Sequence, residues 1–176
     1  MDDSNAEIKL NAVNLGGWLL WEGWIWGSGF NSEQKVMANI EKRAGTELGQ
    51  AFRDSIYQNY VTQQDIAAIA EMGFNCVRIP INHTLLGNAT TEGNFALLDS
   101  AVAWCKQHNI YAVIDMHALP GGQSPLFISD PDPVNLWKSE DNKSSSVALW
   151  YNIALHYAHE PTVAGYDLIN EPNTRE

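Results

Sequence analysis

The chain has 176 residues, and its ten Lys and Arg against twenty-one Asp and Glu give a formal charge of −11 at neutral pH. This balance excludes a nucleic-acid partner, because neutralising phosphates requires clustered basic side chains that the sequence lacks. Hydrophobic residues make up 45% and charged residues only 18%, which favours a folded globular chain. The length suits a single domain over residues 1–176, but it falls short of the about 250 residues of a closed eight-stranded α/β barrel.

The first strand is expected at residues 11–15, the second at 76–81, the third at 110–116 and the fourth at 165–169. Each is a short, nearly continuous apolar run, which fits strands covered on both faces. Residues 16–60, after the first strand, read as an elaborate loop with at least one helical stretch, around 51–60. Residues 119–142, after the third strand, form a second long loop rich in Pro, Gly, Asp and Ser.

Three helices are expected between the strands. The first begins at a capping box of Thr62 and Asp65 and ends at Gly73, with Ile66, Ile69, Ala70 and Met72 at helical spacing. The second spans about 95–107. The third follows the serines at 144–146 and ends before Pro161, and its buried side is predicted to contain Val147, Leu149, Trp150, Ile153, Ala154 and Tyr157. Strands and helices therefore alternate, which predicts an α/β fold with a parallel sheet and right-handed crossovers.

The cysteines and the lengths of the apolar runs exclude several other classes of protein. Cys76 and Cys105 stand in apolar segments without a CxxC pattern, so we expect buried free thiols, no metal and no other cofactor. No run approaches the roughly 18 apolar residues of a membrane-spanning helix, and no membrane partner is expected. Residues 1–5 lack a basic and then apolar leader, which predicts a soluble chain, cytoplasmic as given or secreted if a leader has been removed.

Polar residues stand at three of the predicted strand ends. They are Arg78, His117 and the run Asn170–Pro172. Taken singly, each has an ordinary structural interpretation: an arginine can pair with an acid, a histidine can be a satisfied core residue, and a Glu beside Pro can begin a loop. All three belong to the carboxyl edge of one parallel sheet, where such proteins place their chemistry, so together they predict a functional site.

Four sequence blocks resemble the amino-terminal half of a family 5 glycoside hydrolase, the cellulase and exo-β-1,3-glucanase type of (β/α)8 enzyme. They are Asn14–Leu20 (NLGGWLL), Gly73–Ile81 (GFNCVRIPI), Ile114–Gln123 (IDMHALPGGQ) and Asp167–Asn173 (DLINEPN). They span nearly the whole chain in the order of the family. The resemblance implies a parallel (βα)4 half of a TIM barrel.

The resemblance also implies roles for individual residues. Glu171 resembles the general acid/base at the end of the fourth strand, and Asn170 resembles the neighbour that contacts the sugar 2-hydroxyl. Arg78 and His117 are similar to residues that line the cleaving subsite. Glu22 resembles a substrate-contacting acid found after the first strand in the exo-glucanase branch. The implied reaction is retaining hydrolysis of β-linked glucans or β-glucosides, in which a second carboxylate faces a proton-donating one.

Aromatic residues add to this interpretation, because their faces bind the apolar faces of sugar rings. Four tryptophans cluster in the loop after the first strand, at 18, 21, 24 and 26. Ordinary packing is expected to account for at least two of them, and Trp24 is the one assigned to substrate binding. Trp137 and Trp150 are expected to pack in the core or between helices. The role of His83, which follows the Arg-Ile-Pro block, stays open.

The family's nucleophile, a Glu at the end of the seventh strand, has no counterpart in this sequence. A half barrel would also expose two strand edges, which is unfavourable in water. Three explanations remain open: a fragment of a longer hydrolase, one half of a split enzyme with a complementary carboxyl-terminal polypeptide, or a homodimer that closes a (βα)4+(βα)4 barrel. In the homodimer the third strand of the second copy would stand where the seventh strand belongs and would offer Asp115 and His117, but Asp115 lies deeper than His117 and is not assigned as the nucleophile. The competing functional hypothesis is a carbohydrate-binding or oligomerising module with little or no turnover.

Overall fold

The computed structural model describes residues 7–87 and 94–174. These residues contain a four-stranded parallel sheet whose strands neighbour one another in chain order. The strands are β1 at Ala12–Asn14, β2 at Cys76–Asn82, β3 at Tyr111–Ala118 and β4 at Val163–Asp167. The predicted parallel α/β arrangement is therefore confirmed. The fourth strand begins and ends two residues before the predicted run, because its pairing with β3 ends where Asp115 meets Asp167.

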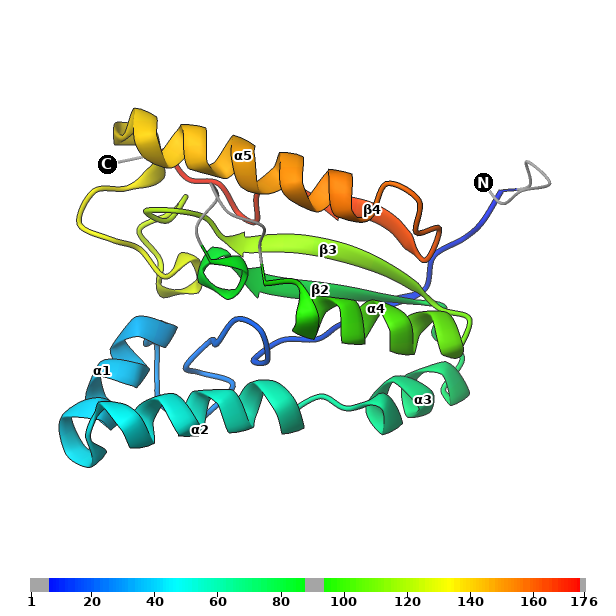
Figure 1. Cartoon of the computed structure of the whole chain (residues 1–176), viewed down its shortest axis with the longest axis horizontal. Helices are drawn as coiled ribbons and strands as arrows, with labels where there is room; N and C mark the ends of the chain where they lie inside the picture. The colour runs from blue at the N-terminus through cyan, green and yellow to red at the C-terminus, as the bar shows by residue number, and fades with distance from the viewer. Residues whose placement is uncertain (1–6, 88–93, 175–176) are drawn as a thin grey trace.

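Helices connect the strands. They are α1 at Glu33–Ala44, α2 at Thr46–Asn59, α3 at Gln63–Glu71, α4 at Ala96–Gln107 and α5 at Glu140–His156. Figure 1 shows α3, α4 and α5 following one another around the sheet in the order of the strands. The arrowheads of β2 and β3 point toward the end of the sheet where α1 lies. This carboxyl end is where the sequence predicts the site.

The start of α3 is set by the predicted capping box. The Thr62 backbone N–H and hydroxyl both donate to Asp65 Oδ2, at 2.8 and 2.7 Å. Gly73 has φ +87°, a left-handed conformation that ends the helix where the sequence places its stop. Ile66 is buried, but Met72 is exposed because it lies at the end of the helix and points away from the sheet's core.

Helix α5 differs most from its prediction. It begins at Glu140, earlier than the serines at 144–146, because the Ser139 hydroxyl accepts the Asn142 N–H and caps the helix there. Leu149, Ile153 and Tyr157 are buried as predicted. The prediction was wrong for two residues, since Val147 is 71% exposed and Ala154 is also exposed. Both lie outside the apolar stripe of α5. The residues of that stripe, Leu149, Ile153 and Tyr157, are spaced four apart and face the core.

The segment after β1 contains more structure than predicted. Helix α2 begins before the expected stretch at 51–60, and α1 was not predicted at all. Val36, Met37 and Ile40 of α1 stand at helical spacing and pack against the core, a short apolar pattern that the prediction missed. The two helices cover buried Trp18 and Trp21 from the loop, and the Trp18 indole donates to the Tyr57 carbonyl at 2.8 Å.

The core lies between the sheet and its helices. Alternate residues of β2 and β3 are fully buried there, including Val77, Ile79, Ile114 and Met116. Cys76 and Cys105 are buried and free, as predicted. Trp137 and Trp150 are partly buried against the core, also as predicted. In the part of the chain that the structure describes, no helix combines the length and the apolar character needed to cross a membrane.

Candidate active site at the carboxyl ends of the strands

Arg78 is the third residue of β2 rather than its end, and its side chain contacts residues of the other three strands. Its Nη1 donates to Asn14 Oδ1 of β1 at 3.1 Å, and its Nη2 lies 2.9 Å from Asp115 Oδ2 of β3. Its Nε and Nη2 both donate to Asp167 Oδ2 of β4, at 3.1 and 2.8 Å. Nη2 also donates to Asn170 Oδ1 at 2.9 Å. A guanidinium presents several donors in a fixed plane, so this one side chain links β2 to residues of β1, β3 and β4.

A second chain of contacts runs from Asp115 through His117 to Asn170. Asp115 Oδ2 lies 2.6 Å from His117 Nδ1, and His117 Nε2 lies 3.1 Å from Asn170 Nδ2. All three side chains are buried. Burial raises the pKa of Asp115, while the hydrogen bond from His117 and the charge of Arg78 oppose this rise. The predicted residues Arg78, His117 and Asn170 thus meet at one edge of the sheet.

Gln123 joins the loop after β3 to the segment after β4. Its side-chain Nε2 donates to the carbonyls of His117 and Asn170, at 2.7 and 2.8 Å, and its Oε1 accepts the Leu119 N–H at 3.2 Å. The Asn173 N–H donates to the Gln123 carbonyl at 3.0 Å. Sequence reasoning missed this residue as a site component. Its position directly after the Gly-Gly pair in residues 119–123 could have drawn attention to it. Only the folded chain shows which carbonyls its side chain bonds.

Glu171 follows Asn170 directly, so its backbone lies at the rim where Arg78 and His117 converge. It is exposed, and its φ of +40° places a non-glycine residue in the left-handed region. Such conformations cost energy and occur often at functional positions. Among the described residues, no hydrogen bond or ion pair holds the Glu171 carboxyl.

Glu22 and Trp24 form a pair in the loop after β1. The Trp24 indole N–H donates to Glu22 Oε2 at 2.9 Å, and Glu22 is buried while Trp24 is 54% exposed. Gly16 brings the pair near the strand ends: a side chain there would meet Asn14 Nδ2 at 3.5 Å and Glu22 Oε1 at 3.7 Å. Glu22 and Asn14, which accepts from Arg78, therefore both lie next to Gly16.

The other loop tryptophans are structural. Trp18 and Trp21 are fully buried, and Trp26 stacks on Tyr60 with ring centroids 5.0 Å apart. Only Trp24 of the four presents much of its surface to solvent. His83, whose role the sequence left open, lies with Nδ1 3.3 Å from the Ala118 carbonyl, and burial lowers its pKa.

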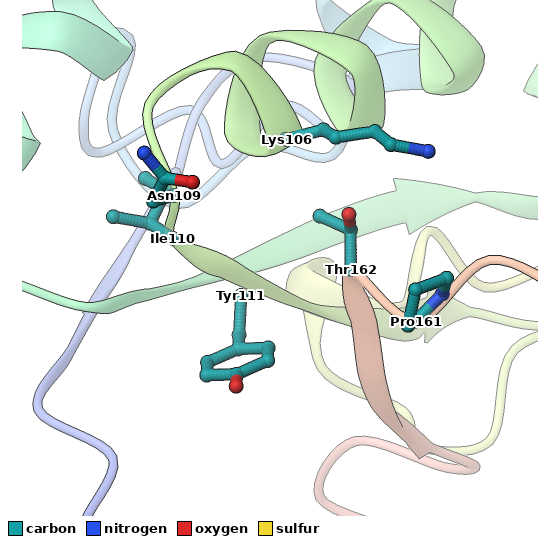
Figure 2. Close-up of a pocket in the computed structure, with 6 residues that line it drawn as sticks. All are labelled: Lys106, Asn109, Ile110, Tyr111, Pro161 and Thr162. Atoms are coloured by element: carbon teal, nitrogen blue, oxygen red, sulfur yellow. The ribbon is translucent and has the colours of Figure 1, made fainter. Parts of the chain in front are cut away.

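A hollow of about 310 Å³ lies at the other end of the sheet. It is lined by Lys106, Asn109, Ile110, Tyr111, Pro161 and Thr162, around the amino ends of β3 and β4 (Figure 2). The Lys106 ammonium pairs with Glu160 at 3.0 Å. The hollow contains no carboxylate among its lining residues and none of the predicted site residues. Residues 7–87 and 94–174 contain no cluster of His, Cys, Asp or Glu that could hold a metal ion.

A parallel α/β half barrel with polar side chains gathered at the carboxyl ends of its strands has the architecture of a barrel enzyme. The chain belongs to glycosyl hydrolase family 5: the family model described as Cellulase (glycosyl hydrolase family 5) matches residues 30–176. The predicted family is thereby confirmed.

Relatives match along nearly the whole chain. A "Probable glucan 1,3-beta-glucosidase A" of Emericella nidulans is 33% identical over 173 residues, which cover 94% of this chain and 43% of the relative. A "Beta-xylosidase" of Phanerodontia chrysosporium is 30% identical over 179 residues, which cover 98% of this chain and 37% of the relative. The chain thus spans about two fifths of the length of these relatives.

Solved structures show the same fold. The crystal structure of AoRut superposes with a TM-score of 0.77 at 24% identity, over 95% of this chain and 49% of the other. A rutinosidase from Aspergillus niger superposes with a TM-score of 0.71 at 24% identity, over 93% of this chain and 49% of the other. The chain is therefore a partial (β/α) barrel, as the sequence predicted.

Proposed function

We propose that this chain forms the amino-terminal half of a glycosidase active site that acts on β-linked glucans, with Glu171 as the general acid/base. The observation that carries the proposal is the network of Arg78, His117 and Asn170 immediately beside Glu171. The name of the Emericella nidulans relative supports a β-glucan or β-glucoside substrate.

In the proposed reaction Glu171 donates a proton to the glycosidic oxygen while a carboxylate on the opposite side attacks the anomeric carbon. Water then hydrolyses the glycosyl-enzyme, with Glu171 accepting its proton, so the anomeric configuration is retained. Asn170 contacts the sugar 2-hydroxyl, and Arg78 and His117 hold that amide. Glu22 and Trp24 bind the sugar from the loop after β1, through a carboxylate and an exposed aromatic face.

The nucleophile in this proposal comes from a second half barrel. Three other carboxylates belong to this site. Asp115 and Asp167 pair with Arg78, and Glu22 accepts from Trp24, so each of them already has a partner. Either a complementary carboxyl-terminal half or a second copy of this chain closes the barrel. A closed barrel would cover the apolar residues exposed on α5, in β4 and directly after it, which include Tyr151, Leu155, Tyr166 and Leu168.

Because Asp115 and Asp167 are already paired with Arg78, one alternative function is a carbohydrate-binding or oligomerising module without turnover. The two functions differ in the hydrolysis of an aryl β-glucoside. We would assay the chain alone and mixed with the carboxyl-terminal part of the Emericella nidulans relative that the chain does not match. The enzyme proposal expects hydrolysis in the completed barrel, its loss in Glu171→Gln, and its retention in Glu160→Gln, a control at the opposite end of the sheet. Sugar binding without hydrolysis in every mixture would instead support the module.

A further inference from the structure

Asp115 is the buried acid that the proposed reaction does not use. Its carboxylate is fully buried, and Oδ2 alone contacts both Arg78 at 2.9 Å and His117 at 2.6 Å. Its other oxygen, Oδ1, receives no hydrogen bond from the described residues. A carboxylate kept only to stabilise the fold would be expected to pair both oxygens, since an unpaired buried oxygen costs free energy.

The directions of the hydrogen bonds follow from the chemistry of the groups. A guanidinium can only donate, so the Asn170 atom that faces Arg78 is its oxygen. The Asn170 atom that faces His117 is then its NH2 group, which needs an acceptor, and His117 Nε2 must carry no proton. The neutral imidazole therefore carries its proton on Nδ1 and donates it to Asp115.

We infer that Asp115 is a positioning residue, which sets the orientation of the Asn170 amide by holding His117 in the Nδ1–H form. Without Asp115, Nδ1–H would lose its acceptor, and only the Asn170 NH2 group would still favour the proton on Nδ1. The Nε2–H form would point a donor at the Asn170 NH2 group. Rotating the Asn170 amide would remove this contact between two donors. Its NH2 group would then face Arg78, which is also a donor. The role of Asp115 in sugar recognition rests on the proposed function, in which this amide contacts the 2-hydroxyl.

The first experiment observes His117 directly in the 176-residue chain. Two-bond ¹H–¹⁵N NMR spectra at neutral pH distinguish the two imidazole tautomers. We expect the Nδ1–H form in the wild type and a shift toward the Nε2–H form in Asp115→Ala. Asp115→Asn keeps an acceptor oxygen and is expected to restore the wild-type tautomer. Asp99→Ala is the matched control, because Asp99 contacts a different histidine, His156, at 2.8 Å.

The second experiment measures the consequence for sugar binding by NMR titration of the chain mixed with the carboxyl-terminal part of the Emericella nidulans relative, which completes the proposed site. The probes are methyl β-D-glucopyranoside and its 2-deoxy analogue, which lacks the hydroxyl that Asn170 would contact. We expect the wild type to bind the first probe about tenfold more tightly, the contribution of one good hydrogen bond to a neutral group. Asp115→Ala should reduce this ratio to about one while leaving the binding of the 2-deoxy probe unchanged, and Asp115→Asn should restore it.

The outcomes separate the two proposals. An unchanged tautomer in Asp115→Ala overturns the positioning role, whatever the sugars show. A changed tautomer with an unchanged ratio of affinities overturns the link from Asp115 to sugar recognition. A wild type that binds neither probe, with the expected change of tautomer, overturns the proposed function and leaves Asp115 orienting Asn170 for another purpose.

Discussion

Arg78 Nη2 and Asp167 Oδ2 lie 2.8 Å apart, although the two residues are 89 positions apart in the chain. The same nitrogen also lies 2.9 Å from buried Asp115. The contact therefore ties the second strand to the third and fourth, and it brings the segment with Asn170 and Glu171 to the rim. Its loss should disturb both the fold and the proposed site.

We expect Arg78→Lys to lower the free energy of unfolding by about 2 kcal/mol. A lysine keeps the charge but cannot reach both carboxylates in one plane, which leaves a buried carboxylate poorly paired. Urea denaturation measures the change. Lys106→Met breaks the exposed pair with Glu160 and serves as the control, with an expected cost below about 1 kcal/mol. Equal costs for the two variants would show that the strand ends do not depend on Arg78.

The sequence predicts those features that depend on neighbouring residues. The capping box of Thr62 and Asp65 is a local signal, and the structure confirms it. Alternation of strands and helices predicted the parallel sheet for the same reason. Helix α1 escaped prediction because its apolar pattern is short: Val36, Met37 and Ile40 are its large apolar residues, and charged or polar residues surround them.

Contacts between distant segments could not be predicted in the same way. The sequence placed Arg78, His117 and Asn170 at one edge, because strand ends in a parallel sheet share that edge. It did not show that Asp115 joins Arg78 to His117 or that Gln123 bonds two carbonyls, since these contacts depend on side-chain directions. The exposure of Val147 was also hidden, because an apolar residue on a helix does not reveal whether a neighbour covers it.

A second prediction concerns the buried acid of α1. The Glu33 carboxyl accepts from the Tyr57 hydroxyl at 2.6 Å and from the Trp21 N–H at 3.3 Å. Burial, with the charge of Asp130 adding to it, raises the pKa of Glu33 from 4.5 to about 7, while these hydrogen bonds and Arg53 oppose the rise. The folded chain therefore holds this proton more tightly than the unfolded chain does.

Stability should fall as pH rises from about 4.5 to about 7, because in this window the folded state binds more protons at Glu33 than the unfolded state. The stabilising contribution of the Glu33 proton is complete below about pH 4.5 and is lost above about pH 7. At about 1.4 kcal/mol per pH unit, this shift amounts to roughly 3–4 kcal/mol. The measurement is urea denaturation of wild type and Glu33→Gln across this range. The difference between their free energies of unfolding should change with pH, since glutamine does not titrate. A constant difference would contradict the prediction.

A third prediction concerns the apolar surface of α5 and β4. Val147, Tyr151 and Leu155 are exposed at four-residue spacing, so they lie on one side of α5. Exposed apolar stripes of this kind are typical of surfaces that bind another chain. We expect the isolated chain to sediment at twice or more of its 19.6 kDa mass.

Tyr151→Asp should shift that assembly toward the monomer, because it places a charge in the centre of the stripe. Leu48→Asp is the matched control, since Leu48 is similarly exposed on α2. Sedimentation velocity at several concentrations provides the measurement. A well-folded wild-type monomer at all of them would refute the prediction, and so would an equal effect of the two substitutions.

The last prediction follows from the backbone of Glu171. Its φ of +40° costs a non-glycine residue about 1 kcal/mol, whereas glycine adopts this conformation freely. The greater freedom of glycine in the unfolded chain offsets about half of this gain, so Glu171→Gly should stabilise the chain by about 0.5 kcal/mol. Glu171→Gln keeps the strain and has no contact to lose among the described residues, so its thermal midpoint should match that of the wild type. A large loss of stability in Glu171→Gln would mean that the carboxylate supports the fold, which would weaken its assignment to chemistry.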